Sequence, residues 1–228
     1  MSEHHFANTS ELDAALAQRV AEQLNSAINE RDQATLVLSG GSTPKGLFAH
    51  LSKTPLAWDK VTILLADERW VAATHADSNE RLVREALLTD RAASAKFLSL
   101  VGHYPNTDIN LLAVNSALST LAQFDVVILG MGTDGHTASL FPCAAELEAG
   151  LTTDADALMV TPTTAPHQRI SLSKQRLRNT ALGLLHIVGD DKREVLTTAR
   201  NDGDKHRYPI LNFVDEAPAF EVWWAPKN

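Results

Sequence analysis

The stretch at residues 124–140, FDVVILGMGTDGHTASL, decides how the rest of the chain is interpreted. It opens with an apolar run that holds three successive β-branched residues at 126–128, a composition typical of a strand buried on both faces of a parallel sheet. Gly130, Gly132 and Gly135 follow the run and allow a tight turn in which the backbone comes close to a ligand. The stretch therefore predicts a buried strand that ends in a ligand-binding loop.

Two side chains in this loop, Asp134 and His136, can take part in acid–base chemistry. In an open parallel sheet the ligand crevice lies outside the carboxyl ends of the strands, which is where this loop is expected. A histidine titrates near neutral pH, so His136 is a candidate general base with Asp134 as its neighbour. The local pattern is equally compatible with a second interpretation, in which Asp134 caps the next helix and His136 is an exposed residue beside it.

Composition predicts one α/β domain. The chain has 228 residues, and 44% of them are hydrophobic, which is enough for a sizeable core. No internal repeat, low-complexity tract or long Gly/Ser linker divides it, so we expect a single domain over residues 1–228, with residues 1–8 as a mobile tail. The one cysteine, Cys143, excludes an internal disulfide framework and fits a reducing compartment. We expect its thiol to pack as a small apolar side chain.

Charge and hydropathy narrow the range of partners. The formal net charge of −8 argues against nucleic acid as a ligand. Neither a secretory signal nor an apolar run long enough to span a bilayer is recognisable, so we expect a soluble, cytoplasmic protein without a membrane partner. An anionic ligand would need local cations to overcome the negative background, which makes the positions of lysine and arginine informative.

A second ligand-binding turn is predicted at residues 39–44, SGGSTP. A short β-type run at 36–38 precedes it, and Pro44 occupies what would be the first position of a helix. Backbone N–H groups and hydroxyls that converge at a helix start form an anion site, although Thr43 could instead be an ordinary N-cap. We favour phosphate binding, and the candidate residues are Gly40, Gly41, Ser42 and Thr43. The spacing matches neither a dinucleotide fingerprint nor a Walker loop, so no nucleotide is predicted.

A third strand end carries charged residues. The apolar run at 61–65 is strand-like and is followed by Asp67, Glu68 and Arg69. Charged residues at the end of a buried strand are costly unless they face a solvated cleft or pair with one another. They are therefore candidates for the same crevice, and the alternative is a surface turn with an ion pair between Asp67 and Arg69.

The remaining segments alternate between helical and strand patterns. Helices are expected from an N-cap at Ser10, from a capping arrangement at 77–80, over 111–121, and from Asp190 or Asp191. Further strands are expected at 158–160, at 169–172 as an edge strand, at 182–188, and at 220–224 with two tryptophans packed at an edge. This alternation predicts an α/β fold with a Rossmann-like, doubly wound, mainly parallel sheet and helices on both faces.

Two lysines occupy unfavourable positions in the first turns of predicted helices. Lys192 and Lys45 each follow a strand end, where the helix macrodipole disfavours a cation by a few tenths to about 1 kcal/mol. Two such lysines suggest cations that are held near a bound anion. For Lys45 taken singly, we favour a solvated surface position.

Taken together, these motifs resemble those of the 6-phosphogluconolactonases related to glucosamine-6-phosphate deaminase. The resemblance covers nearly the whole chain in the right order, through SGGSTP at 39–44, DERWV at 67–71, DSN at 77–79, LGMGTDGHTASLFP at 129–142, RISLS at 169–173 and GDDK at 189–192. It implies one Rossmann-like α/β domain that hydrolyses 6-phosphogluconolactone to 6-phosphogluconate in the oxidative pentose phosphate pathway. It also implies that no nucleotide, cofactor or metal takes part.

The resemblance assigns roles to individual residues. It implies that His136 activates water against the lactone carbonyl, that Asp134 orients His136, and that Arg69 lies at the substrate with the acid Asp67 before it. The implied phosphate site comprises Gly40, Gly41, Ser42, Thr43, Arg169 and Lys192. Attack on the carbonyl builds negative charge on oxygen, which requires a donor such as Arg69 or a loop N–H.

The chain departs from the family pattern at two places, neither of which carries a residue assigned to chemistry. Ala72 stands where proline is expected after DERWV, and the ending at 223–226, WWAP, lacks the usual acidic close.

Two other functions are compatible with such a fold. In glucosamine-6-phosphate deaminase-like sugar-phosphate isomerases, the strand-end acid is usually followed by Glu-Tyr, and the loop after the histidine carries a glutamate for ring opening. Arg69 and Phe141 occupy those places here, which favours lactone hydrolysis because a lactone needs only activated water. A non-catalytic sugar-phosphate sensor would normally bring a DNA-binding helix-turn-helix, for which this acidic chain has no room. We expect a small sugar-phosphate lactone as partner, and a monomer or weak homodimer as the assembly.

Overall fold

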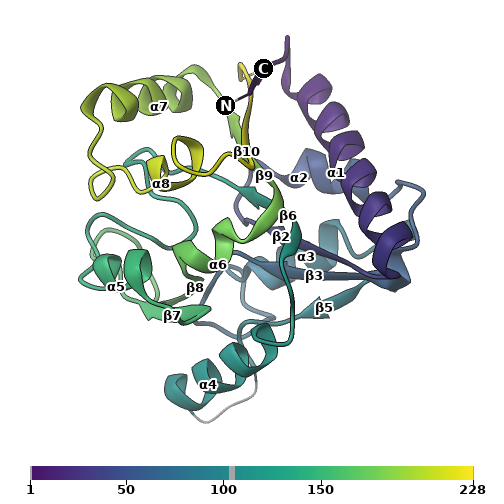
Figure 1. The fold of residues 1–228 in the computed structure, drawn as a ribbon, viewed down its shortest axis with the longest axis horizontal. Helices are drawn as coiled ribbons and strands as arrows, with labels where there is room; N and C mark the ends of the chain where they lie inside the picture. The colour runs from purple at the N-terminus through teal and green to yellow at the C-terminus, as the bar shows by residue number, and fades with distance from the viewer. Residues whose placement is uncertain (1, 103–105, 228) are drawn as a thin grey trace.

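The computed structural model describes residues 2–102 and 106–227, and a seven-stranded sheet forms its centre (Figure 1). The strand order is β1-β10-β9-β6-β2-β3-β5, and all neighbours are parallel. The strands are β1 (Glu3–His5), β2 (Ala34–Leu38), β3 (Val61–Leu65), β5 (Lys96–Leu98), β6 (Phe124–Leu129), β9 (Thr180–Val188) and β10 (Phe220–Ala225). The predicted mainly parallel α/β fold is confirmed.

Helices cover both faces of this sheet. The helices of the described residues are α1 (Thr9–Arg31), α2 (Lys45–Leu51), α3 (Asn79–Ala86), α4 (Thr107–Leu118), α5 (Leu147–Thr152), α6 (Lys174–Arg178), α7 (Asp190–Asp202) and α8 (Leu211–Val214), with short 3₁₀ turns at Trp58–Lys60 and Asp90–Ser94. In Figure 1, α1 lies on one side of β9 and β10, and α7 and α8 lie on the other.

The alternation of side chains along β9 and β10 explains the two covered faces. Leu184 and Trp223 belong to the large core that includes the buried side of α1. Their sequence neighbours Leu185 and Val222 instead pack in a second cluster with Leu196 of α7. Successive residues of a strand point to opposite faces, so two apolar layers require the near-continuous apolar runs that the sequence shows.

The order of the strands positions the functional site. From β2 the chain adds β3 and β5 on one side, and it then returns through β6, β9 and β10 on the other. The switch in direction therefore lies between β2 and β6, which pair through Leu36 with Val126 and Val37 with Val127. Loops that leave two such strands diverge and leave a crevice between them.

A small second sheet was not predicted. It has the order β4-β8-β7, with β4 (Asp67–Arg69), β8 (Arg169–Leu172) and β7 (Ala157–Val160), and both pairings are antiparallel. The strand at 169–172 is thus the centre of this sheet and not an edge strand. Its pairing with a three-residue segment about a hundred positions earlier is a long-range contact, which no local pattern reveals.

Both ends of the chain also differ from expectation. Residues 3–5 are not part of a mobile tail, because they form β1 and pair in parallel with Val222, Trp223 and Trp224 of β10. Consequently β10 is an interior strand, and β1 is the edge. Trp223 stacks on His4 at 4.5 Å between ring centroids, and Trp224 donates its indole N–H to the Gly189 carbonyl. Met1 lies outside the described residues.

Helix starts deviate by one or two residues from the predicted caps. Asn8, rather than Ser10, caps α1 by accepting the Glu11 N–H at 2.9 Å. Gly189, with a φ of 101°, precedes α7, so neither Asp190 nor Asp191 is its N-cap. Ser78 does cap α3, as the capping pattern predicts.

Candidate active site

A cavity of about 330 Å³ opens at the carboxyl ends of β2, β6 and β9, at the switch in strand direction. Its walls contain nine of the sequence-predicted site residues, namely Gly40, Gly41, Ser42, Thr43, Asp67, Arg69, His136, Arg169 and Lys192. The tenth, Asp134, is not among the residues that line the cavity, but its side chain is hydrogen-bonded to that of His136. The fold therefore brings together residues that are separated by up to about 150 positions in the chain.

His136 and Asp134 form a hydrogen-bonded pair at the cavity wall. The His136 Nδ1 atom lies 2.5 Å from Asp134 Oδ1, which also accepts the backbone N–H of His136 at 3.2 Å. Burial raises the pKa of Asp134, but the hydrogen bond to His136 and the charge of that ring lower it more, so the net shift is downward. An ionised carboxylate only accepts hydrogen bonds, so the proton of the imidazole is on Nδ1 and Nε2 keeps a free lone pair.

The loop that carries this pair is not a helix cap. The next helix, α5, begins at Leu147, so the interpretation of Asp134 as a capping residue is wrong. The loop is closed instead by the Gly132 N–H, which donates to the His136 carbonyl at 2.9 Å. A Cβ at position 132 would lie 2.2 Å from His136 Nδ1, so the approach of the ring requires a glycine there.

Phe141 packs against the imidazole on the side of the loop that leads to α5. The two rings are stacked, with centroids 4.0 Å apart and planes inclined by 30°. The Phe141 side chain is buried in a small cluster with Ala144 and Val160. The orientation of the His136 imidazole is thus fixed by the Phe141 ring against its face and by the Asp134 carboxylate at its edge.

The turn at residues 39–44 forms the opposite part of the cavity wall. Ser39 donates its hydroxyl to the Ile128 carbonyl at 3.0 Å and accepts the Gly130 N–H at 3.3 Å, which ties this turn to the end of β6. Gly41 has a φ of 92°, a conformation that favours glycine. Pro44 is the N-cap of α2 and no side-chain cap is formed, so Thr43 does not have the ordinary capping role that was the alternative.

Asp67 and Arg169 meet across the small antiparallel sheet. The Arg169 Nη1 atom lies 3.8 Å from Asp67 Oδ2, and both side chains are less than a tenth exposed. Asp67 also accepts the Ser139 hydroxyl at 2.6 Å, which connects it to the histidine loop. Burial lowers the pKa of Arg169, while the charge of Asp67 opposes that shift. Asp67 therefore pairs with Arg169 and not with Arg69, contrary to the surface-turn alternative.

Arg69 is positioned by the loop that follows β4. Its Nη1 group donates to the Asp77 carbonyl at 2.5 Å, and its backbone is paired with Arg169 in the register of β4 and β8. Two guanidinium groups thus reach the same cavity from neighbouring strands. Such a concentration of positive charge in a chain with a net charge of −8 suits an anionic ligand.

Glu68 was expected at the crevice with Asp67 and Arg69, but it is buried and is not among the residues that line the cavity. Its carboxylate accepts hydrogen bonds from the Ser78 hydroxyl and from three backbone N–H groups, those of Arg69, Asn79 and Glu80. Burial raises its pKa, and these hydrogen bonds oppose the rise. Two of the donors are free N–H groups at the start of α3, so Glu68 fixes that helix against β4. The DSN motif before α3 was the only available signal.

Asn79 and His186 were also missed, although both line the cavity. Asn79 donates to the Asp67 carbonyl at 3.1 Å, and its side chain occupies the space that a Cβ on Gly40 would need. The Nε2 atom of His186 in β9 lies 3.3 Å from Asp13 Oδ1 of α1, with both side chains buried. The contact of His186 joins elements at opposite ends of the chain, and that of Asn79 spans a loop of irregular structure, so neither could be predicted from helix or strand spacing.

The two lysines that share a position after a strand end differ in the structure. Lys192, in the first turn of α7, is among the residues that line the cavity. Lys45, in the first turn of α2, is exposed and is not among them. The favoured solvated position of Lys45 is confirmed.

Cys143 lies in a second, more open hollow behind the histidine loop, together with Asp134, His136 and Phe141. Its side chain is only half-buried, so it is more accessible than the predicted small apolar packing implies. Burial raises the pKa of its thiol, but hydrogen bonds with Thr164 and Thr163 lower the pKa by more than burial raises it. The resulting pKa is about 7. The Sγ atom lies 3.2 Å from the Thr164 hydroxyl.

None of the helices that the structure describes combines the length and the apolar character that a bilayer crossing requires.

Comparisons with known proteins identify the family of the chain. The 6-phosphogluconolactonase of Pseudomonas putida is 41% identical over 225 residues, which cover 98% of this chain and 92% of the relative. That of Rhizobium meliloti strain 1021 is 40% identical and covers 98% of both. The crystal structure of a 6-phosphogluconolactonase from Shewanella baltica superposes with a TM-score of 0.96 at 44% identity, and 99% of this chain and 97% of that one are covered. Residues 7–224 match the family of glucosamine-6-phosphate isomerases and 6-phosphogluconolactonases, and the chain belongs to this family.

Proposed function

We propose that this protein hydrolyses 6-phosphogluconolactone to 6-phosphogluconate, a step of the oxidative pentose phosphate pathway. The observation that carries this proposal is the hydrogen-bonded pair of His136 and Asp134 at one wall of a cavity whose other walls hold a glycine-rich turn and three basic side chains. The high identity to proteins named 6-phosphogluconolactonase supports the same substrate.

The phosphate group would bind where positive charge and hydrogen-bond donors are concentrated. The donors are the backbone and hydroxyl groups of the turn Gly40, Gly41, Ser42 and Thr43, together with Arg169 and Lys192. A phosphate at this end lies away from the reacting carbon. Its binding energy would therefore orient the lactone carbonyl toward His136 without taking part in the chemistry.

Water attack would begin at His136. The free lone pair of Nε2 takes a proton from water as the oxygen adds to the lactone carbonyl, and the Asp134 carboxylate stabilises the imidazolium that forms. The carbonyl oxygen becomes negatively charged, and Arg69 or a loop N–H donates to it. When the tetrahedral intermediate collapses, the ring oxygen leaves and takes the proton from Nε2. The product is the open-chain acid, and His136 is neutral again.

Phe141 favours hydrolysis over ring-opening isomerisation. An isomerase must move protons between two carbons and a ring oxygen, which requires a further acid–base group beside the histidine. The place beside His136 is filled by the Phe141 ring at 4.0 Å, which has no titratable group. A single base with one orienting carboxylate is sufficient for the activation of water.

Lactone hydrolysis is tested by comparing the enzymatic with the spontaneous rate of 6-phosphogluconolactone opening. We expect strong acceleration by the wild type and a loss of about 10²-fold or more in kcat for His136→Ala. If the wild type gives no acceleration, the proposed function is wrong. If the wild type accelerates the reaction and His136→Ala retains full activity, the function stands and the assignment of the base is wrong.

The phosphate site has a matched pair of variants. Lys192→Ala should raise KM for the lactone with a smaller effect on kcat, because it removes binding energy that is present before the reaction begins. Lys45→Ala removes the same charge from the first turn of a helix outside the cavity and should leave KM unchanged. Equal KM values for the two variants would contradict the assignment of Lys192 to the phosphate site.

We further propose that the protein is cytoplasmic and works as a monomer or weak homodimer. Among the described residues, the large apolar side chains that are exposed are Ile109 and Leu112, both on α4, which is a small apolar area for an obligate interface. Light scattering after size exclusion at micromolar concentration should give a mass near that of one chain, and a stable tetramer would contradict this. Cell fractionation tests the compartment.

A further inference from the structure

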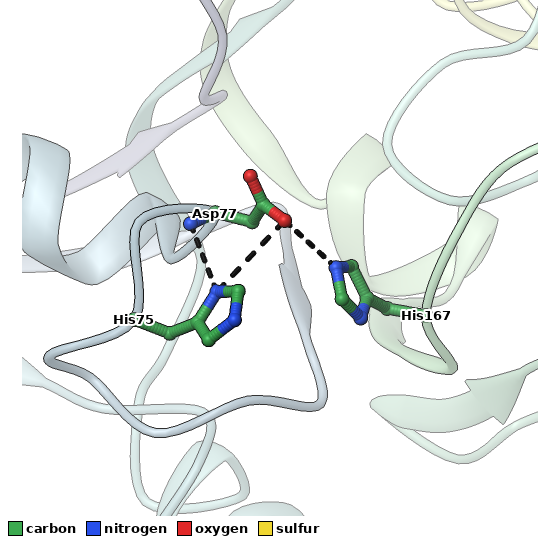
Figure 2. Close-up of side chains that lie close together, drawn as sticks. All are labelled: His75, Asp77 and His167. Carbon is green, nitrogen blue, oxygen red and sulfur yellow. Dashed lines mark hydrogen bonds and ion pairs between the residues drawn. The ribbon is translucent and has the colours of Figure 1, made fainter.

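A group of three potential metal ligands lies outside the cavity. His75, Asp77 and His167 each offer one ligand atom, and these atoms all lie within 4.8 Å of one another. Figure 2 shows both imidazole rings turned toward the carboxylate of Asp77. Within residues 2–102 and 106–227, this is the one group of three or more such side chains that meets that distance.

The Asp77 carboxylate is the centre of the group. Its Oδ2 atom lies 2.8 Å from His167 Nε2 and 3.8 Å from His75 Nδ1. His75 Nδ1 also accepts the Asp77 backbone N–H at 3.1 Å, so this nitrogen carries a lone pair and no proton, and a bound metal ion would replace that hydrogen bond. The Asp77 side chain is about half exposed, so its carboxylate is accessible to a cation.

The distances fit a small divalent cation after minor side-chain rotation. Zinc binds imidazole nitrogen and carboxylate oxygen at about 2.0–2.2 Å, which places neighbouring ligand atoms about 3.4 Å apart in a tetrahedral site. The two separations from Asp77 Oδ2 lie on either side of that value. All three side chains are at least a quarter exposed, so their rotation disturbs no packed core.

The type of ligand selects the type of metal. Two imidazoles suit zinc and its neighbours cobalt, nickel and copper, whereas magnesium and calcium prefer sites made of oxygen alone. Three protein ligands leave at least one coordination position open. A neutral His167 can bind through Nε2 if its proton is on Nδ1, which is the tautomer that metal-bound histidines commonly have.

The three ligands come from two loops that both lead to the cavity. His75 and Asp77 lie in the segment between β4 and α3, and Asp77 accepts the Arg69 side chain through its carbonyl. His167 lies two residues before β8, which begins with Arg169. The loops are already joined at their bases, where the Trp70 N–H donates to the Gln168 carbonyl at 2.7 Å.

We propose that His75, Asp77 and His167 form a binding site for a divalent transition metal of the zinc type, which fastens the 70–78 loop to the 161–168 loop beside the cavity. The metal has a positioning role at this place, because its ligands belong to the segments that hold Arg69 and Arg169. It does not replace His136 in the activation of water. The site would thereby make the order of the substrate-facing arginines depend on metal binding.

Zinc binding to the purified, chelator-treated protein tests this site directly. Isothermal titration with Zn²⁺ should give one site per chain in the wild type, and Zn²⁺ should raise the melting temperature. His75→Ala and His167→Ala should each weaken binding by about tenfold or more, because loss of even an indirect partner of a metal ligand costs 10–100-fold. Both residues are on the surface, so the folded state is expected to survive.

Two control variants separate this site from others. His206→Ala removes an exposed histidine that is also paired with a carboxylate, that of Glu148 at 2.7 Å, but without a second imidazole. His136→Ala removes the histidine of the cavity. Zn²⁺ affinity should remain at the wild-type level in both. Co²⁺ as a probe should give visible absorption bands in the wild type and in both controls, and lose them in His75→Ala.

The outcomes are decisive in either direction. One site per chain that is lost in His75→Ala and His167→Ala and kept in the controls supports the proposal. It is overturned if the wild type binds no Zn²⁺, or if binding survives both ligand variants. Loss of binding in His136→Ala alone would place the metal in the cavity, which also overturns it. None of these readouts depends on lactone hydrolysis, so this proposal and the proposed function can fail separately.

Discussion

At the scale of single residues, the contact between His136 and Asp134 depends on the absence of a side chain at Gly132. A Cβ there would lie 2.2 Å from His136 Nδ1 and 2.6 Å from Asp134 Oδ1. We expect Gly132→Ala to separate the pair and to lower kcat for lactone hydrolysis by about 10²-fold, the usual contribution of a positioned base. The free energy of unfolding should change little, because the loop is partly exposed.

The control for this variant is Gly130→Ala, where a Cβ would meet no heavy atom within 4 Å. The NMR chemical shifts of the His136 ring should differ from the wild type in Gly132→Ala and should match it in Gly130→Ala. Unchanged kcat and unchanged chemical shifts in Gly132→Ala would show that the loop adjusts without separating the pair.

The reactivity of Cys143 is a second prediction at this scale. Hydrogen bonds with two threonines bring the pKa of its thiol to about 7, so about half of it is thiolate at neutral pH. The thiolate is the reacting form, and the rate of alkylation by iodoacetamide should therefore rise with pH to a midpoint near 7 instead of the usual value of about 8.5. Thr164→Val removes one of these hydrogen bonds and should move the midpoint upward. A wild-type midpoint near the usual value would contradict the prediction.

At the scale of elements, Glu68 joins β4 to the start of α3. It accepts three backbone N–H groups and a hydroxyl, and a glutamine in its place would direct an NH₂ group at some of these donors. Hydrogen bonds to a charged group contribute about 1.5–3 kcal/mol, so Glu68→Gln should lower the free energy of unfolding by about 2 kcal/mol or more. Urea denaturation measures this loss.

An exposed carboxylate supplies the comparison. Glu85→Gln on α3 breaks an exposed pair with Arg81 and should cost less than about 0.5 kcal/mol. Because Glu68 adjoins Arg69 and Asn79, its replacement should also raise KM for the lactone, whereas Glu85→Gln should not. A Glu68→Gln variant as stable as the wild type would show that these four hydrogen bonds are easily replaced by water.

At the scale of the whole molecule, strands from both ends of the chain belong to one sheet. β1 pairs with β10, and β10 continues through β9 to β6 and β2 in the centre. We propose that residues 1–228 form one domain and unfold in a single cooperative transition. Calorimetry should give equal calorimetric and van't Hoff enthalpies. Two resolved transitions, for instance one for the small β4-β8-β7 sheet, would contradict this.

Local patterns were sufficient for the elements whose surroundings are uniform. The apolar run of β6 predicts a strand that is buried on both faces, and its burial is complete along Phe124–Leu129. Likewise, Ser78 caps α3 as its motif predicts, because an N-cap involves only neighbouring residues. The predicted edge strand at 169–172 was wrong, because the position of a strand in a sheet depends on its partners and not on its own sequence.

The candidate site likewise contains features that local patterns predict and features that depend on the tertiary structure. The sequence by itself determined which strand ends carry chemically useful residues, since glycine-rich turns, Asp134–His136 and the charges at 67–69 are all local patterns. Only the tertiary structure decided that Asp67 pairs with Arg169, that Ser139 and Asn79 fasten Asp67, and that His75, Asp77 and His167 meet. These contacts join residues that lie up to about a hundred positions apart, and the free energy that selects them comes from the packing of the entire sheet.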